Sequence, residues 1–168
     1  MKLWLWISAC GMLAVSNLTM AQEDPGKSKI GMVRVTVYHA TNGNPKEAGV
    51  KTSAVPKETC ERLSSEAQLR FKHYGMLGQD TQPLLRSYES WAQPLKPSGE
   101  VLVRFDAKSH PTKKTTVLDL ELWLSHKKIL KSDVHLEGNR PLFVLGPEWR
   151  KGRLIIAVAL APEAKPGP

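Results

Sequence analysis

Apolar residues recur with a period of two along much of this chain, and that spacing limits the fold more than any other feature of the sequence. Residues 117–124 read Val-Leu-Asp-Leu-Glu-Leu-Trp-Leu, so the four leucines fall on one face and the other residues alternate with them. Successive side chains of a strand point to opposite faces of a sheet, so this pattern predicts a strand with one face in a core. Residues 130–136 repeat the pattern after the polar link 125–128, which has the length of a hairpin loop.

The remaining chain predicts more strands and one helix. Strands are also expected near residues 31–39, 101–106, 142–145 and 153–161. Residues 154–160 are apolar on both faces, which predicts a central strand covered on each side. Residues 57–67 follow a proline and have helical spacing, and an early hairpin is expected from residues 69–74 and 84–91 with 78–81 at its tip. We therefore predict a mostly β fold, an antiparallel immunoglobulin-like β-sandwich with one short helix near the N-terminal side.

The first 21 residues have the shape of a signal peptide. A basic start at Lys2 precedes an uncharged apolar run, and small residues suit cleavage after Ala21. A retained membrane anchor is the alternative, although the apolar part, residues 3–15, is shorter than the roughly 20 residues that a spanning helix needs. We therefore expect an exported protein of the periplasm or cell surface. The expected organisation is a signal peptide at 1–21, a flexible segment at 22–29, a single β-sandwich domain at 30–161 and a flexible tail at 162–168.

After cleavage the chain is basic, has a single cysteine and is long enough to form a core of its own. Removal of residues 1–21 takes one of the 24 Lys and Arg and none of the 16 Asp and Glu, so the net charge of +8 becomes +7. A chain of this size buries nearly 70% of its unfolded surface, by the usual scaling of about 68–70% for 150 residues, and needs neither metal nor disulfide for stability. Cys60 is then the only cysteine, so it is either a buried thiol or part of an intermolecular disulfide.

Signatures of catalysis are missing from the sequence. There is no G-x-S-x-G, no G-x-x-x-x-G-K-[ST], no G-x-G-x-x-G and no H-E-x-x-H. The five histidines lack the short spacings of zinc ligands, so we expect no metal site and no cofactor. The sequence also contains no reading helix or stacking motif for nucleic acid. These observations predict a protein that is not an enzyme.

Asp119, Glu121 and Trp123 form the best candidate site. Alternate residues of a strand lie about 7 Å apart on one face, so two carboxylates and an indole could together contact a partner protein or a sugar. Paired acids at that spacing also occur in glycoside hydrolases, which makes hydrolysis a third hypothesis. Solvated acids beside a tryptophan that covers a neighbouring strand are the structural alternative.

Two further groups of residues are candidates for binding. Cations gather in the links that follow residues 101–106 and 117–124, and loops at one end of a sandwich can merge into a patch that attracts anionic partners. This candidate basic patch consists of Lys113, Lys114, Lys127, Lys128 and Lys131. Trp149 and Arg150 have the composition of an interface anchor, and a tryptophan folded back over the core is the alternative. Trp91 is expected in the core, where it would close the early hairpin.

Two late segments stand out within the pattern: Leu118-Asp119-Leu120-Glu121-Leu122-Trp123 and Pro141-Leu142-Phe143-Val144-Leu145-Gly146-Pro147-Glu148-Trp149-Arg150. With the leader and the early helix, they make residues 30–161 similar to the small exported immunoglobulin-like proteins that accompany bacterial type IV pilus machinery. The resemblance implies a non-enzymatic envelope component that pairs with other envelope or pilus-assembly proteins. Position 16 is Ser where a pilin has Glu, so the resemblance implies an accessory role and not a major pilin. A carbohydrate- or anionic-polymer-binding module, with anionic glycans as ligands, is the alternative.

Overall fold

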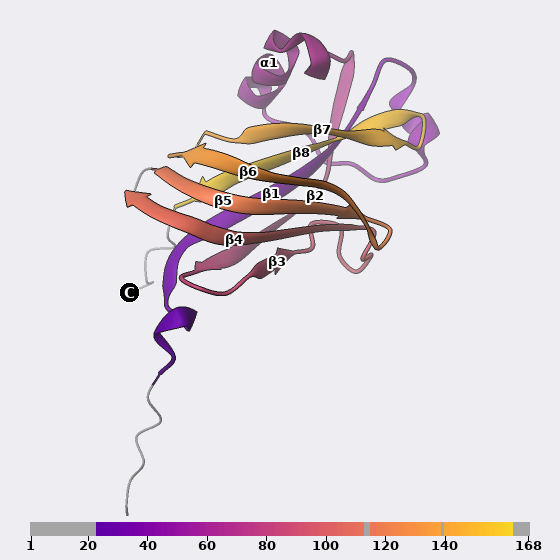
Figure 1. Ribbon diagram of the computed structural model, residues 1–168. Helices are drawn as coiled ribbons and strands as arrows, with labels where there is room; N and C mark the ends of the chain where they lie inside the picture. Colours follow the sequence, from indigo (N-terminus) through magenta and orange to yellow (C-terminus); the bar gives the residue numbers. More distant parts are fainter. Residues whose placement is uncertain (1–22, 113–114, 139, 163–168) are drawn as a thin grey trace, which may run out of the picture.

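The computed structural model describes residues 23–112, 115–138 and 140–162, and its strands form two antiparallel sheets packed face to face (Figure 1). Sheet A has the order β2-β1-β8-β7, and sheet B has the order β3-β4-β5-β6. The strands are β1 Lys29–Thr41, β2 His73–Leu85, β3 Ser90–Ala92, β4 Val101–Thr112, β5 Thr115–Leu124, β6 Lys127–Glu137, β7 Leu142–Trp149 and β8 Gly152–Ala161. The expected mostly β, antiparallel two-sheet architecture is confirmed.

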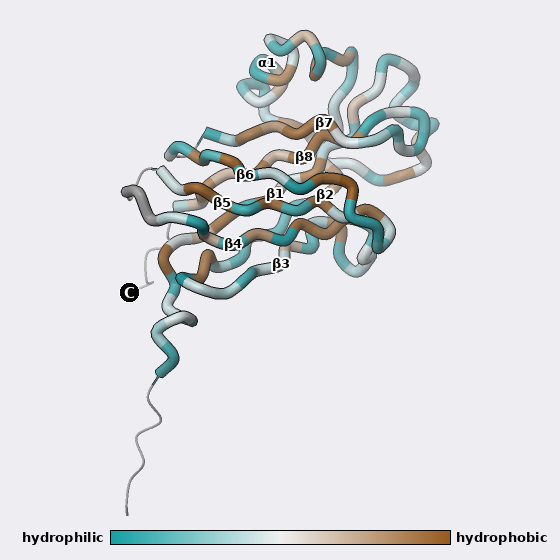
Figure 2. The backbone as a smooth tube through the Cα atoms, in the orientation of Figure 1, coloured by the Kyte–Doolittle hydropathy of each residue, from teal (hydrophilic) through white to brown (hydrophobic). Residues whose placement is uncertain are grey.

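The core between the sheets is built from the residues that alternate in the sequence. Leu118, Leu120 and Leu122 of β5 are each at most 4% exposed, and they share one buried cluster with Val33 and Val35 of β1. Figure 2 shows the apolar residues recurring along the strands of both sheets. Full burial of a valine or leucine side chain is favourable by about 1.5–3 kcal/mol, so these positions hold the two sheets together.

The central strands of sheet A are buried on both faces. From β8, the side chains that enter the core between the sheets are Leu154, Ile156 and Val158. Ile155 and Ala157 point to the opposite face of the sheet, where a second cluster forms around the fully buried Leu63 of helix α1, Lys57–Ser65. The connection from β1 to β2 therefore supplies the cover for this face. The predictions of a doubly covered late strand and of a short helix are both confirmed.

The expected early hairpin is wrong. Residues 73–85 form one continuous strand, β2, which pairs with β1 along its length. Gly78 lies in the middle of this strand, and a Cβ added there would lie 2.1 Å from the carbonyl oxygen of Pro94. The glycine thus permits a close approach of two distant backbone segments and does not mark a turn. Trp91 lies in the short strand β3 and is 40% exposed, so its predicted place in the core is also wrong.

The segment before β1, which was expected to be flexible over 22–29, makes specific contacts from Asp24 onward. A 3₁₀ turn spans Pro25–Lys27, and the Asp24 carboxylate accepts a hydrogen bond from the Gly26 N–H at 2.8 Å. The Tyr88 hydroxyl donates to the same carboxylate. Two further 3₁₀ turns, Pro45–Ala48 and Ala67–Leu69, lie in the connection that carries α1.

The predicted signal peptide and residues 163–168 of the predicted tail lie outside the described residues. No helix in the described ranges is long and apolar enough to cross a membrane. The described residues begin at residue 23, so cleavage of the leader after Ala21 stays a prediction.

Two hairpins turn on residues with left-handed backbone conformation. Ser125 and His126 have φ values of 47° and 65° between β5 and β6, and Arg150 and Lys151 have φ values of 44° and 60° between β7 and β8. Positive φ at both central residues is the type I′ geometry, whose twist matches that of the flanking strands. Gly152 follows the second turn, where a Cβ would lie 2.3 Å from Nε2 of His39 and 2.6 Å from the carbonyl oxygen of Ala40.

Gly152→Ala should lower the free energy of unfolding by about 1–3 kcal/mol, because the added methyl group must displace His39 or the backbone of β1. Urea denaturation followed by tryptophan fluorescence measures this change. Gly99→Ala is the matched control, since nothing lies within 4 Å of a Cβ at that position. Equal unfolding free energies for the two variants would contradict the close packing at Gly152.

Candidate functional site

The outer face of sheet B carries no described helix, whereas α1 packs on the outer face of sheet A (Figure 1). Asp119, Glu121 and Trp123 point to this outer face because the leucines between them enter the core. We call it the open face. The residues that matter for its chemistry are Glu89, Trp91, Arg104, Asp106, Lys108, Asp119, Glu121, Trp123, Lys128, Lys131 and Asp133. Asp119 and Glu121 are only 7% and 5% exposed, so both acids lie beneath other side chains and are not the solvated acids of the structural alternative.

Glu121 is held by three hydrogen-bond donors. Nζ of Lys128 and Nζ of Lys131 each lie 3.2 Å from Oε1, and the indole N–H of Trp123 donates to Oε2 across 3.1 Å. Burial raises the pKa of Glu121, but the hydrogen bonds from the two lysines and the tryptophan lower it more, to about 2. Glu121 is therefore ionised at neutral pH.

A row of three aspartates crosses the strands of the open face. The register places Asp106 of β4 opposite Asp119 of β5, and Asp119 opposite Asp133 of β6. Like charges directly opposite one another destabilise a sheet, and here cations lie between them. The ion pairs, by N–O distance, are Arg104–Asp106 at 2.9 Å, Arg104–Asp119 at 3.7 Å, Lys131–Asp119 at 3.1 Å and Lys108–Asp133 at 2.7 Å.

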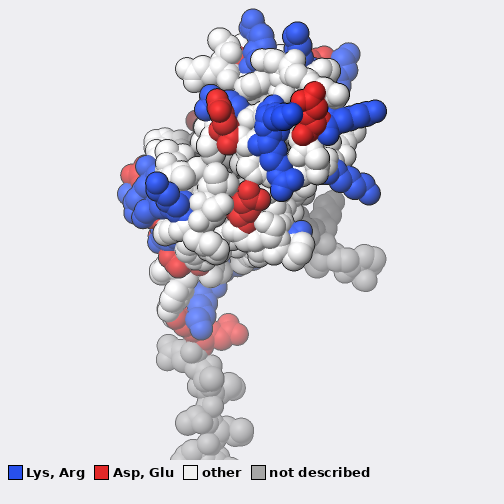
Figure 3. Space-filling model, turned by 90° about the vertical axis from the view of Figure 1, so that its right-hand side faces the viewer, with Lys and Arg blue, Asp and Glu red and all other residues white. Residues whose placement is uncertain are grey.

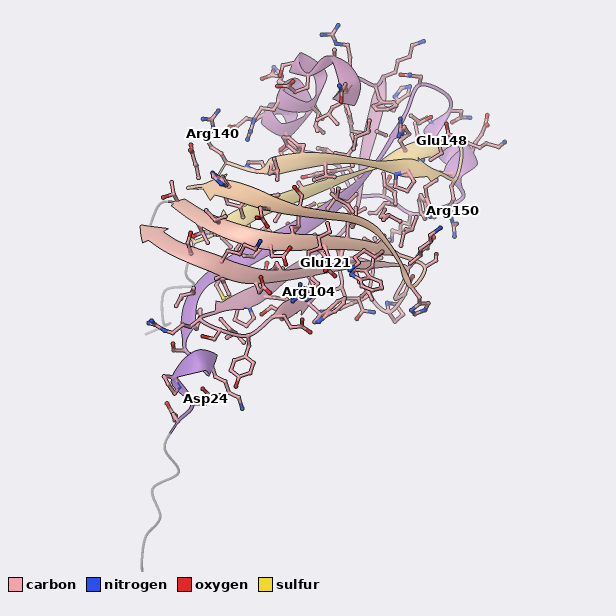
Figure 4. All side chains as sticks on the ribbon, in the orientation of Figure 1. Asp24, Arg104, Glu121, Arg140, Glu148 and Arg150 are labelled. Carbon is pink, nitrogen blue, oxygen red and sulfur yellow. The ribbon has the colours of Figure 1, made fainter. Side chains whose placement is uncertain are left out.

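Arg104 of β4 is the centre of this network. Besides Asp106 and Asp119, its guanidinium forms ion pairs with Glu89, and with Glu121 at 3.7 Å. Figure 4 shows Arg104 and Glu121 beside each other on neighbouring strands. The hydrogen bond to Glu89 raises the pKa of Arg104, while burial lowers it less. Sequence reasoning missed Arg104, although the apolar residues on either side of it mark it as outward-facing.

Two tryptophans from different strands meet on the open face. The ring centroids of Trp91 and Trp123 lie 6.0 Å apart, with an angle of 52° between their planes. The Trp91 indole N–H donates to Glu89 at 3.0 Å, as that of Trp123 does to Glu121, so each polar edge already has a partner. Nζ of Lys128 lies 5.4 Å from the centroid of the Trp123 ring. What the pair exposes is mainly apolar ring surface.

The structure describes three of the five lysines of the predicted basic patch. Lys113 and Lys114 lie outside the described residues, and Lys127 pairs with Leu124 at the start of β6. Lys128 and Lys131 belong to the open face, where they neutralise acids. The candidate acids and these candidate cations thus form one site. Figure 3 shows basic side chains interspersed with acidic ones on the side of the molecule that lies at the right of Figure 1.

Trp149 and Arg150 lie away from the open face, at the β7–β8 hairpin. The Trp149 indole N–H donates to Glu100 at 2.6 Å, and its ring packs on the core and edge-on against His39, with centroids 5.9 Å apart. The guanidinium carbon of Arg150 lies 4.8 Å from the centre of that ring. Figure 4 places Arg150 beside Glu148 at this end of the molecule. The geometry favours the folded-back interpretation of Trp149.

Cys60 of α1 is partly exposed and unpaired, and its Sγ lies 3.9 Å from the carbonyl oxygen of Val55. Its pairing with another chain stays a prediction. Within the described ranges, no group of three or more His, Cys, Asp or Glu is arranged to hold a metal ion.

The open face is poorly suited to acid catalysis. A general acid needs a pKa near the working pH, and that of Glu121 lies far below neutral. Both of its oxygens are also occupied by donors from the chain itself. Oδ1 of Asp119 accepts no hydrogen bond from a described residue, but it is buried. The two acids that would accept hydrogen bonds from a sugar are thus engaged or covered.

Comparison with known proteins gives no family for this chain. No family model matches it, and neither a curated protein nor a solved structure matches it.

Glu121→Gln should weaken the fold at neutral pH and flatten the acid branch of its pH dependence. The pKa of Glu121 is about 2 in the folded chain against an ordinary value of 4.5, so its contribution is complete above about pH 4.5 and is lost as the pH falls toward 2. Urea unfolding at a series of pH values measures this loss.

Glu61→Gln is the matched control for that experiment. The Glu61 carboxylate is exposed and forms a 3.6 Å surface pair with Lys57, so its replacement should leave the pH dependence unchanged. If Glu121→Gln and the unaltered protein lose stability in parallel between pH 4.5 and 2, the three donors do not stabilise the charged form of Glu121.

Proposed function

We propose that this chain is an exported, non-enzymatic protein-interaction module of the cell envelope, and that it binds its partner through the open face of sheet B. In keeping with the resemblance, we assign it an accessory role in type IV pilus or secretion assembly. The partner is a protein that presents an apolar patch to the Trp91–Trp123 pair.

One observation carries this proposal: two adjacent tryptophans lie on the uncovered face among charges that already have partners. Tryptophan and arginine at the centre of a face are the residue types that contribute most to protein interfaces. Burying an unpaired charge is costly, but the carboxylates near the rings are already paired with Arg104, Lys128 and Lys131. A partner can therefore cover the pair without bringing charges of its own.

A sugar ligand is the second candidate, since Trp91 could stack on a pyranose ring. The proposal favours a protein because both oxygens of the largely buried Glu121 already accept hydrogen bonds from the chain, and because the two rings are tilted by 52° and do not form one flat platform. The two-layer architecture supports the likeness to immunoglobulin-like proteins. The strand order supports it less, because β3 to β6 form a simple meander and immunoglobulin domains have Greek-key connections.

A photo-crosslinking residue in place of Trp91, in cells that produce the protein, tests the proposal. We expect one covalent adduct with a defined envelope protein, and none from the same residue at the exposed position Lys51. Adding Trp123→Ala should reduce that adduct about tenfold or more, because truncation of a central interface tryptophan typically costs about 2 kcal/mol.

Ile30→Ala is the control substitution, since Ile30 is a 36% exposed apolar residue of the other sheet. It should leave the adduct unchanged. Adducts of equal yield from positions 91 and 51, or an adduct insensitive to Trp123→Ala, would refute binding through the open face. Trp91-dependent binding on a glycan array without a protein adduct would replace the proposal with the carbohydrate alternative.

A further inference from the structure

A groove lies on the opposite side of the molecule, between α1 and the outer face of sheet A. It has a volume of about 310 Å³, near the lower end of the roughly 300–1,000 Å³ that is usual for small-molecule sites. Its floor comes from the central strands, with Thr36 of β1 and the small side chains Ala157 and Ala159 of β8. Helix α1 covers only part of this face, so the small residues leave a hollow beside the helix.

Two arginines line this groove, and neither has an acidic partner in the part of the chain that the structure describes. Arg34 is exposed on β1 and forms no ion pair there. Arg62 of α1 donates to the carbonyl oxygen of Pro141 at 3.4 Å, and its guanidinium carbon lies 5.3 Å from the centre of the Phe143 ring. Each guanidinium carries five N–H donors in a planar fork, so most of these donors remain available to a ligand.

The polar side chains of the floor add further hydrogen-bond donors to those of the two arginines. The Thr36 hydroxyl donates to Oε1 of Gln79 at 3.3 Å, and the two amide N–H groups of Gln79 have no acceptor among the described residues, so they can donate to a ligand. Glu58 is the one carboxylate among the described lining residues, and no ion pair joins it to either arginine. The apolar part of the lining, Met76 with the alanines, offers contact for a carbon skeleton.

We propose that this groove binds a small organic carboxylate, with Arg34 and Arg62 as its anion-recognising residues. A carboxylate matches the guanidinium fork through two parallel hydrogen bonds, and the alanine floor accommodates the carbon atoms attached to it. Inorganic phosphate would use the donors and leave the apolar floor empty. This site is independent of the proposed function, because it lies on the other sheet.

Titration of the ¹⁵N-labelled protein with glutarate, followed by NMR, tests the assignment. We expect saturable shifts of the Arg34 and Arg62 side-chain N–H signals and of the Gln79 amide. Glutaramide, which is neutral and of similar size, should cause none of these shifts. Arg34→Gln and Arg62→Gln should each weaken glutarate binding about tenfold or more, since a hydrogen bond to a charged group contributes about 1.5–3 kcal/mol.

Arg150→Gln, at the distant β7–β8 hairpin, and Trp91→Ala, on the open face, are the controls and should leave glutarate binding unchanged. Arg34→Lys should bind more weakly than the unaltered protein, because an ammonium group lacks the planar fork. Non-saturable shifts, equal shifts with glutaramide, binding unaffected by both arginine substitutions, or tighter binding of inorganic phosphate would each overturn the proposal. Loss of glutarate binding leaves the crosslinking result at Trp91 unaffected, so the two proposals fail separately.

Discussion

Burial of β1 and β8 on both faces is the constraint on which the rest of this structure depends. Val35 and Val37 fill the space between the sheets, while Tyr38 and Ala40 of the same strand lie in the second cluster beneath α1. A strand with two apolar faces needs two covers, and sheet B supplies only one of them. The long connection between β1 and β2 therefore folds back over sheet A as a helix. The consequence is asymmetry, because α1 covers one outer face and no described helix covers the other.

Much of the fold could be predicted because burial of alternate residues is a local property of a strand. The pattern at 117–124 identified the core leucines of β5, and the unbroken apolar run at 154–160 identified β8 as doubly covered. The early hairpin failed for a reason that local sequence does not contain. Glycine allows both a turn and a close backbone approach, and the contact that distinguishes them at Gly78 is with the distant Pro94.

The candidate site could also be predicted only as far as one strand determines it. Alternation placed Asp119, Glu121 and Trp123 on one face, but a single strand does not show what lies opposite them. Arg104 reaches Glu121 through the β4–β5 register, and Lys131 through the β5–β6 register. Without those registers, the sequence predicts a separate basic patch and leaves open whether the acids form a site or are solvated. Long-range pairing joins Lys128 and Lys131 to Asp119 and Glu121 in one network of ion pairs.

Charge compensation differs between the two outer faces. On the open face, the carboxylates lie within reach of cations from the same sheet, and Glu121 keeps its proton-free form to about pH 2. A ligand gains little there from its own charge, since it would have to displace an existing ion pair, so apolar contact with Trp91 and Trp123 is the favourable term. In the groove beside α1 the charge of a ligand contributes more, because Arg34 and Arg62 have no carboxylate partner among the described residues. An incoming anion there forms ion pairs and breaks none, and we infer that the two faces select ligands of opposite character.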